Sequence, residues 1–296
     1  MAARLLAVAT ALSLSIACPV LAQDEPGLAP STPWNLHYDD DSCALRRNFG
    51  SGENQVFLEF RRFAPGLSLQ TVIASNRLKP RRQAQFRYRY GDGDWQSAGT
   101  PLTGTLADGF STVVFSSSIV QLPELDEIED TNEREAYFRT LDLKSLELEQ
   151  AAMVDSITLR GAFGERLMVP LGKFDEPIGA LHACIDELMT HWNIDVEAHR
   201  SLSRSAQPID FADSASMVDY PPKMLRERLP GLVNVRLSID ETGKITDCHI
   251  QMPLTDPAFE ESSCADIQHA FEFEPALDKD GNPIASYWTT VVYFRF

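Results

Sequence analysis

The sequence predicts an α+β protein: a β-rich N-terminal domain that ends in a helix, followed by a small C-terminal domain of strands and helices. Three patterns predict this. Partly alternating apolar residues and turn residues recur from residue 43 to about residue 120, as in antiparallel strands. A single apolar stripe at helical spacing then lies between Asp175 and Trp192. Strand, hairpin, helix and strand patterns follow in order between Tyr220 and Phe296.

The N-terminus has the pattern of an export signal. Arg4 precedes an apolar run, Leu5 to Ile16, and Val20-Leu21-Ala22 fits a small-residue cleavage site. We expect cleavage after Ala22 and no permanent membrane span, because the apolar run is too short to remain as a spanning helix. Two alternatives stay open: lipid attachment at Cys18, and retention of the segment as an inner-membrane anchor.

The chain is expected to have five segments. A length of 296 residues allows more than one hydrophobic core. The stretch from Asn193 to Met217 is polar, contains Pro208 and has no sustained periodicity, which is typical of a linker. The expected segments are a signal peptide (1–22), a linker (23–33), the β-rich domain (34–194), a second linker (195–218) and the C-terminal domain (219–296).

Charge and motifs argue against several functions. With a net charge of −17 the sequence has no basic stripe of the kind that nucleic-acid binders need, and anionic membranes are disfavoured too. It lacks a Gly-x-Ser-x-Gly elbow, a His-Glu-x-x-His motif and a glycine-rich phosphate loop. Asp39-Asp40-Asp41 is expected to form a solvated turn, since no spaced partner carboxylates accompany it. We therefore expect no enzyme, with no catalytic residue, no cofactor and no metal.

Two elements of the N-terminal domain are predicted clearly. Phe86, Tyr88 and Tyr90 share one face of a strand, while Arg87 and Arg89 lie on the other. The helical stripe is the second element, and it predicts a helix packed on the sheet through one face. Its apolar residues are Ile178, Leu181, Ile185, Leu188 and Trp192.

In the C-terminal domain, alternation predicts a strand from Leu232 to Ile239 and another from Ile245 to Met252. Asp240-Glu241-Thr242-Gly243 supplies the hairpin between them. Asp256-Pro257 has the pattern of a helix start, because a capping residue precedes proline at the first helical position. A last strand is predicted from Tyr287 to Phe296.

This order of motifs resembles the TonB C-terminal domain family over residues 219–296. The order is Tyr-Pro, a short helix, a Gly-x-Val strand, an Asp-x-x-Gly hairpin, a helix, Phe-x-Pro-Ala, Gly-x-Pro and a terminal strand. The matching residues are Tyr220, Pro221, Gly231, Val233, Asp240, Gly243, Phe273, Pro275, Ala276, Gly281, Pro283 and Phe296. The resemblance implies a three-stranded antiparallel sheet with two helices on one face. It also implies a non-enzymatic periplasmic protein of a Gram-negative cell envelope, linked to transport through a TonB-dependent outer-membrane receptor.

Four cysteines remain after the expected cleavage, and they allow three pairings. The division into domains favours Cys43 with Cys184 and Cys248 with Cys264. Cys248 lies on the expected core face of its strand, and Cys264 shares a helical face with Ile267. An oxidising compartment favours disulfides, and the alternative is buried thiols that act as small hydrophobes.

Connectivity indicates where a partner would bind. Two strands joined by a tight hairpin are neighbours, and the following helix returns the chain so that the last strand lies antiparallel to the first. The last strand then has an open edge that an extended peptide can complete. The residues expected to face that peptide are Tyr287, Thr289, Val291, Tyr293 and Arg295. Two alternatives stay open: the edge is covered by the linker or the N-terminal domain, or the protein has a structural or assembly role in the envelope without transport.

Overall fold

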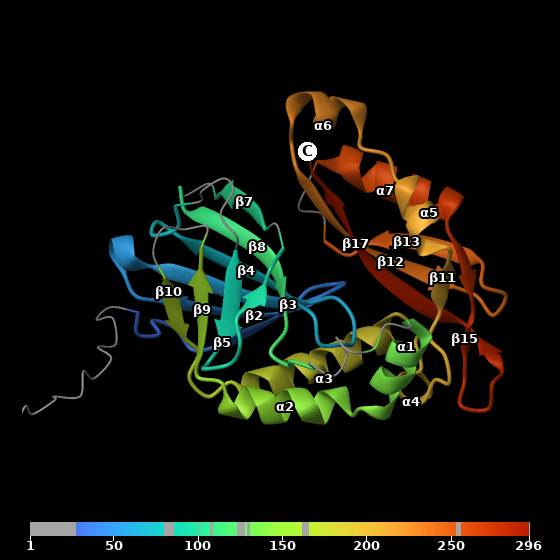
Figure 1. The fold of residues 1–296 in the computed structure, drawn as a ribbon, viewed down its shortest axis with the longest axis horizontal. Helices are drawn as coiled ribbons and strands as arrows, with labels where there is room; N and C mark the ends of the chain where they lie inside the picture. The colour runs from blue at the N-terminus through green and yellow to red at the C-terminus, as the bar shows by residue number, and fades with distance from the viewer. Residues whose placement is uncertain are drawn as a thin grey trace, which may run out of the picture.

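The computed structural model describes residues 28–79, 86–99, 101–106, 109–122, 128, 131–161, 166–252 and 256–295. The expected signal peptide with Cys18, residues 23–27 of the first linker and Phe296 lie outside the described residues. The fold is α+β, as predicted, with antiparallel sheets and helices in both halves of the chain (Figure 1).

The N-terminal region, residues 28–194, contains two antiparallel sheets. The first has the order β1-β2-β3-β4-β8-β7 and the second the order β10-β9-β5-β6. The strands of the first sheet are β1 (Asn35–Tyr38), β2 (Cys43–Phe49), β3 (Val56–Arg62), β4 (Leu69–Ser75), β8 (Ser111–Ser117) and β7 (Leu102–Thr105). Those of the second are β10 (Leu167–Pro170), β9 (Ser156–Arg160), β5 (Arg87–Tyr90) and β6 (Gln96–Ser97). A short 3-10 helix, η1 (Gly52–Asn54), connects β2 to β3.

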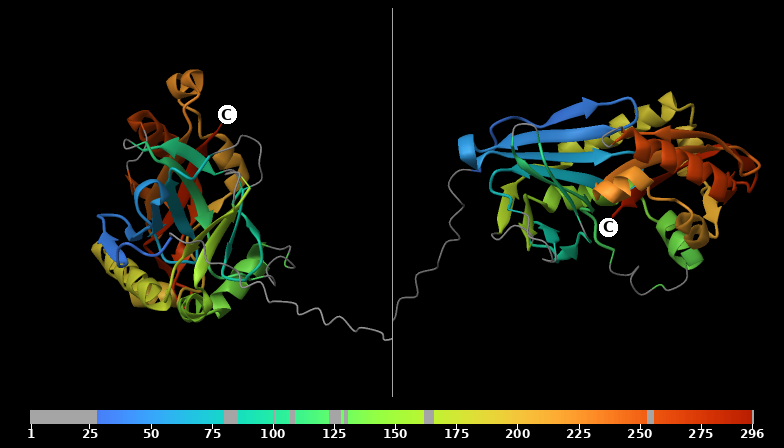
Figure 2. Two further views of the ribbon diagram at one scale, coloured as in Figure 1. Left: turned by 90° about the vertical axis from the view of Figure 1, so that its left-hand side faces the viewer. Right: turned by 90° about the horizontal axis from the view of Figure 1, so that it is seen from above.

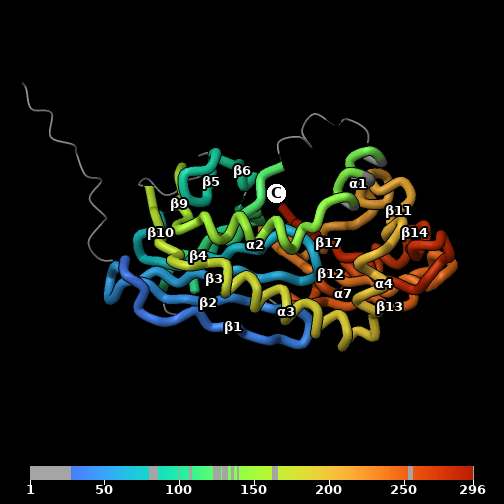
Figure 3. The backbone as a smooth tube through the Cα atoms, turned by 90° about the horizontal axis from the view of Figure 1, so that it is seen from below, coloured from blue at the N-terminus to red at the C-terminus, as the bar shows by residue number. Residues whose placement is uncertain are grey.

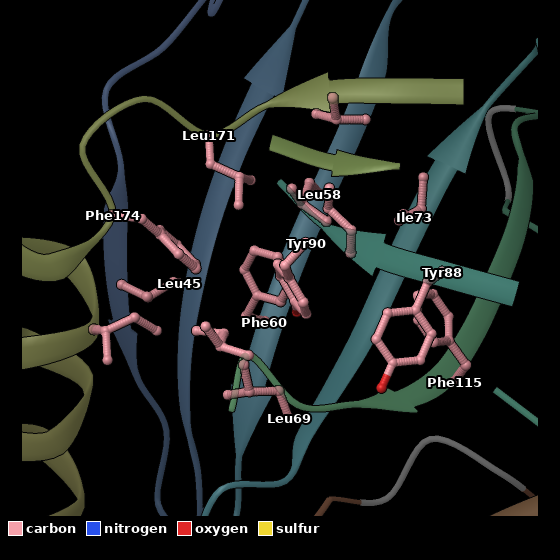
Figure 4. Close-up of a cluster of buried hydrophobic side chains, with 14 of the residues drawn as sticks. Leu45, Leu58, Phe60, Leu69, Ile73, Tyr88, Tyr90, Phe115, Leu171 and Phe174 are labelled. Carbon is pink, nitrogen blue, oxygen red and sulfur yellow. The ribbon is translucent and has the colours of Figure 1, made fainter. Parts of the chain in front are cut away.

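The core of this region lies between the two sheets. Figure 4 shows Leu58 and Phe60 of the first sheet close to Tyr90 of the second, with Tyr88 beside Phe115. The predicted face of β5 is buried, while Arg87 is exposed and Arg89 half-buried on the opposite face. Alternation along β5 therefore separates core from surface, as expected for a strand with one covered face.

Helices α1 (Thr131–Thr140), α2 (Leu143–Met153) and α3 (Asp175–His191) complete the region. Helix α3 buries four residues of the predicted stripe, Ile178, Leu181, Ile185 and Leu188. Helices α2 and α3 run side by side beneath the sheets (Figure 3).

A buried ionic cluster connects these helices to β3. Arg62 Nη2 donates to both carboxylate oxygens of Glu147, at 2.6 and 2.9 Å, and His182 Nε2 lies 2.8 Å from Oε2 of Glu147. Burial by itself raises the pKa of Glu147, but the contacts with His182 and Arg62 outweigh it, so this pKa lies below its usual value. A charge buried in this way needs all of its partners to remain in place.

The C-terminal region contains the predicted sheet, in the order β13-β12-β17 and antiparallel throughout. Its strands are β12 (Gly231–Ile239), β13 (Ile245–Ile250) and β17 (Ser286–Phe294). Helix α7 (Pro257–Ala270) packs on one face, and its first turn is capped by the side chain of Asp256, which accepts from Ala258 N. Helix α6 (Pro222–Glu227) precedes β12. This region has a hydrophobic cluster of its own, which includes Val233, Val235, Leu237, Phe259 and Ile267.

Residues 195–218, expected to be a linker, have regular structure instead. They form α4 (Val196–Arg200), β11 (Gln207–Ile209) and α5 (Phe211–Ser216). Strand β11 pairs with β14 (Glu272–Glu274), and Ala206 is buried in the C-terminal cluster. A small hairpin of β15 (Ala276–Leu277) and β16 (Pro283–Ile284) lies next along the chain. Residues from Leu202 to Val218 therefore add to the C-terminal core, whereas α4 contacts α3 of the N-terminal region.

Candidate partner-binding edge

Strand β17 lies at one edge of the C-terminal sheet. In the described part of the chain it pairs with β12 alone, and no other backbone–backbone hydrogen bond reaches residues 286–295. Which residues of β17 direct their N–H and C=O groups away from β12 can be worked out from the pairing of β12 with β13, at the opposite edge of the sheet. Gln251 N donates to Asn234 O at 2.9 Å, so Asn234 directs its backbone groups toward β13.

Neighbouring residues of a strand direct their backbone groups to opposite edges, so Val233 and Val235 face β17. Their partners Val292 and Thr290 must then face β12. The remaining residues of β17 direct their N–H and C=O groups outward. Together with the adjoining Arg295, they are the residues named from the sequence: Tyr287, Thr289, Val291, Tyr293 and Arg295.

Two grooves flank this edge. The first groove, about 360 Å³, lies between the β3–β4 loop of the N-terminal region (residues 63–68) and β17. The second groove, about 270 Å³, lies between β17 and the helical side, and its floor includes Phe211, Ile267 and Phe271. Thr290, Val291 and Tyr293 line both grooves, so the outward edge forms the ridge between them. Val291 and Tyr293 are 38% and 39% exposed.

One end of the edge is covered. The ring of Tyr287 lies 5.8 Å from the Trp192 ring and stacks on His199 at 5.8 Å. His199 Nε2 also lies 3.0 Å from the hydroxyl of Ser286. Burial raises the pKa of Tyr287 above its usual value. The accessible part of the predicted strand therefore runs from Thr289 to Arg295.

A polar cluster around Asp41 holds the two regions together. The carboxylate of Asp41 accepts from Trp192 Nε1 at 3.2 Å, contacts His249, and lies 3.6 Å from Arg236 Nη2. Gln251 Nε2 donates to the carbonyls of Asp41 and Phe63, at 3.2 and 2.8 Å. The Asp41 side chain is only 13% exposed, so the expectation of a solvated turn is wrong at this residue. These contacts position the β3–β4 loop beside β17, on the side shown in Figure 2 where the blue-to-cyan N-terminal strands meet the orange-to-red C-terminal strands.

Both expected disulfides are present. Cys43–Cys184 joins β2 to α3, and Cys248–Cys264 joins β13 to α7. The second disulfide fixes α7 against the edge of the sheet opposite to β17. The C-terminal sheet is therefore covalently joined to α7 at its β13 edge, whereas β17 contains no cysteine.

The residues that carry the family resemblance mainly shape the sheet, although Tyr220 also lines the second groove. Gly243 has φ +85°, and a Cβ atom there would lie 2.1 Å from the carbonyl oxygen of Phe273, so only glycine fits. Asp240 accepts from Thr242 and Lys244 in the hairpin, and these hydrogen bonds lower its pKa. Tyr220 packs its ring on Phe259 and Phe294, and Gly231 leaves room for Phe259. Of the other matching residues, Val233, Phe273 and Ala276 are buried, Pro221 precedes α6, Pro275 precedes β15, Pro283 begins β16 and Gly281 lies in the turn between these two strands, while Phe296 lies outside the described residues.

Two kinds of feature are absent from the described residues. They contain no group of three or more His, Cys, Asp or Glu side chains placed to hold a metal ion. No helix within the described ranges is long and apolar enough to span a membrane.

Residues 216–296 match the family model described as Gram-negative bacterial TonB protein C-terminal. The family resemblance predicted from the sequence is therefore confirmed for this part of the chain. No curated protein matches the chain. The matched residues include all of β17 and the sheet around it, whereas the N-terminal region and the β3–β4 loop lie outside the match.

Proposed function

We propose that the C-terminal region binds an extended segment of another protein, which adds to the sheet as a fourth strand along β17. The single observation that carries this proposal is the outward backbone edge from Thr289 to Arg295, which β12 leaves unpaired. An added strand forms main-chain hydrogen bonds to such an edge, and its alternating side chains enter the pockets on either side. The two grooves that flank β17 suit this mode of binding.

The partner proposed is the periplasmic segment of a TonB-dependent outer-membrane receptor. The match of residues 216–296 to the TonB C-terminal family supports this class of partner. A periplasmic location is part of the proposal, and the two disulfides support an oxidising compartment. The protein acts by binding rather than by catalysis.

Proline substitution tests the edge. Because Val291 directs its N–H outward, Val291→Pro removes one outward donor and leaves the β12–β17 ladder intact. Binding of receptor peptides, measured by fluorescence anisotropy, is expected to weaken at least about tenfold, as for one lost main-chain contact at a desolvated site. Val291→Ala is the matched control, since it shortens the same side chain but keeps the N–H. Equal binding by a folded Val291→Pro variant and the wild type would refute strand addition.

A structural role in the envelope is the second candidate. The Asp41 cluster favours it, because this cluster fixes the N-terminal region against one face of the sheet, as an assembly contact does. Co-purification from the periplasm separates the two functions. Strand addition predicts capture of a receptor or its plug segment that depends on Val291. A structural role predicts a stable complex that Val291→Pro leaves intact.

A further inference from the structure

The first groove is built from both regions of the chain. The N-terminal region supplies Gln70 of β4 and the β3–β4 loop, which carries Phe63, Pro65 and Leu67. The C-terminal region supplies Asn234 of β12 and the outward part of β17. Apolar side chains thus line the sides of the groove, and carboxamide side chains lie between the two sheets.

Two carboxamide side chains in this groove, those of Asn234 and Gln70, each have one hydrogen-bonding atom without a partner among the described residues. Asn234 Nδ2 donates to Gln70 Oε1 at 3.2 Å. The other two atoms, Asn234 Oδ1 and Gln70 Nε2, are buried and have no hydrogen-bond partner. Asn234 is only 2% exposed, and it lines the groove together with Gln70. Rotating both amides by 180° would again leave one donor and one acceptor free. Buried polar atoms are nearly always paired, so this donor and this acceptor are available to a polar side chain that enters the groove.

We propose that this groove is the side-chain pocket of the added strand and that it selects glutamine; the inference rests on the proposed function. A carboxamide offers one acceptor to Gln70 Nε2 and one donor to Asn234 Oδ1 at the same time. A glutamate at this position offers no donor and meets Asn234 Oδ1 with a negative charge. A leucine fills the space but leaves both buried atoms unpaired, which is unfavourable.

The reach of the side chain favours glutamine over asparagine. Val291 lies opposite Asn234 in the register, so the added residue next to Val291 is two strand spacings, roughly 9.5 Å, from Asn234. A glutamine side chain extends far enough over Val291 to bridge that gap with a hydrogen bond, whereas asparagine is one methylene shorter. Residues before and after this glutamine point into the second groove, whose floor of Phe211, Ile267 and Phe271 accepts apolar side chains. The expected motif is apolar–glutamine–apolar in an extended segment.

Selection from random decapeptides displayed on phage tests the motif with the full chain. Peptides that bind the wild type but not Val291→Pro are expected to show glutamine between two apolar residues. The best such peptide is then synthesised with glutamine, glutamate, asparagine or leucine at that position. The glutamine form is expected to bind about tenfold more tightly than the others, as for one satisfied buried pair.

Two substitutions test whether Gln70 and Asn234 cause the preference for glutamine. Gln70→Met and Asn234→Leu keep the approximate size of each side chain and remove its free polar atom. Because the other carboxamide remains in each single variant, the preference for glutamine over leucine is expected to weaken in each and to disappear in the double variant, while binding still depends on Val291. Using both variants keeps the test decisive if one of them fails to fold.

These experiments distinguish the carboxamide pocket from strand addition, on which the pocket depends. Selected peptides that depend on Val291 but show no glutamine preference would overturn the carboxamide pocket and leave strand addition standing. A glutamine preference that survives in the double variant would also overturn it. If no selected peptide depends on Val291, strand addition fails, and the pocket assignment fails with it.

Discussion

The two regions of the molecule treat the edges of their sheets differently. In the N-terminal region the edge strands are short: β1, β7 and β10 have four residues each, and β6 has two. In the C-terminal region β17 has nine residues and an open edge. Short edge strands are one way in which proteins avoid unwanted pairing, and a long exposed edge is a liability unless it is used. The difference supports a binding role for β17.

The regions also differ in how they are held together. The N-terminal region relies on a buried ionic cluster and on a disulfide between residues 141 positions apart. The C-terminal region relies on a hairpin that only glycine permits and on a disulfide with a separation of 16. Substitutions can therefore weaken one region while leaving the binding edge of the other unchanged.

Removing the disulfides is expected to have the largest effect. In the chain-entropy model, loss of Cys43–Cys184 costs roughly 5 kcal/mol and loss of Cys248–Cys264 roughly 3 kcal/mol, because the closed loops differ in length. Paired cysteine-to-alanine variants measured by urea unfolding test this order. Equal losses for the two pairs would contradict a contribution that depends on loop length.

Breaking the buried ionic cluster is expected to cost about 4 kcal/mol. Arg62→Met leaves the Glu147 carboxylate buried with His182 as its remaining ionic contact, and an uncompensated buried charge is strongly unfavourable. Thermal unfolding measures the loss. The replacement Arg46→Met is the control, since Arg46 pairs with Glu59 nearer the surface. A smaller loss for Arg62→Met than for Arg46→Met would argue against this explanation.

The same cluster predicts a pH dependence. Because the pKa of Glu147 is lower in the folded protein than the unfolded value of 4.5, the unfolded chain binds the proton more readily. Its contribution to stability is therefore fully present above about pH 4.5 and is lost as the pH falls through the folded pKa. Urea unfolding between pH 3 and pH 7 is expected to show a smaller acid loss for Glu147→Gln than for the wild type. An unchanged slope of stability against pH would exclude Glu147 as the cause.

Substitution of Gly243, the glycine of the β12–β13 hairpin, is expected to cause the next largest loss of stability. Gly243→Ala places a Cβ atom against Phe273 O at positive φ, which is expected to cost about 3 kcal/mol and to unfold the C-terminal region first. Gly281 has a similar φ of +84°, but a Cβ atom there would meet no other atom within 4 Å, so Gly281→Ala is expected to cost only about 1 kcal/mol. Unfolding followed by far-UV circular dichroism compares the two. Equal losses would indicate that backbone conformation alone decides the effect.

Local patterns in the sequence predicted much of this structure. Alternation predicted β5, β12, β13 and β17, helical spacing predicted α3, and the division into domains predicted both disulfides. The regular structure of residues 195–218 was not predicted, because α4 and α5 have only five and six residues, too few to show a periodic stripe. Contacts between residues far apart in the sequence were not predicted either. The partners of Asp41, the cover over Tyr287 and the groove between Gln70 and Asn234 join residues more than 80 positions apart, which no window of sequence reveals.

The smallest expected effect on stability comes from placing a charge on the open edge. Val291→Lys puts a lysine on the exposed ridge of β17, where a surface substitution changes stability by no more than about 0.5 kcal/mol. Lysine at an edge opposes pairing with another strand, so both peptide binding and self-association at high concentration are expected to fall. Thr246→Lys is the matched control, because Thr246 is exposed on β13, at the opposite edge of the same sheet. Anisotropy and sedimentation velocity measure the two effects. If both lysines weaken binding equally, net charge rather than the edge of β17 is responsible, and the contrast between the long open edge and the short protected ones loses its functional meaning.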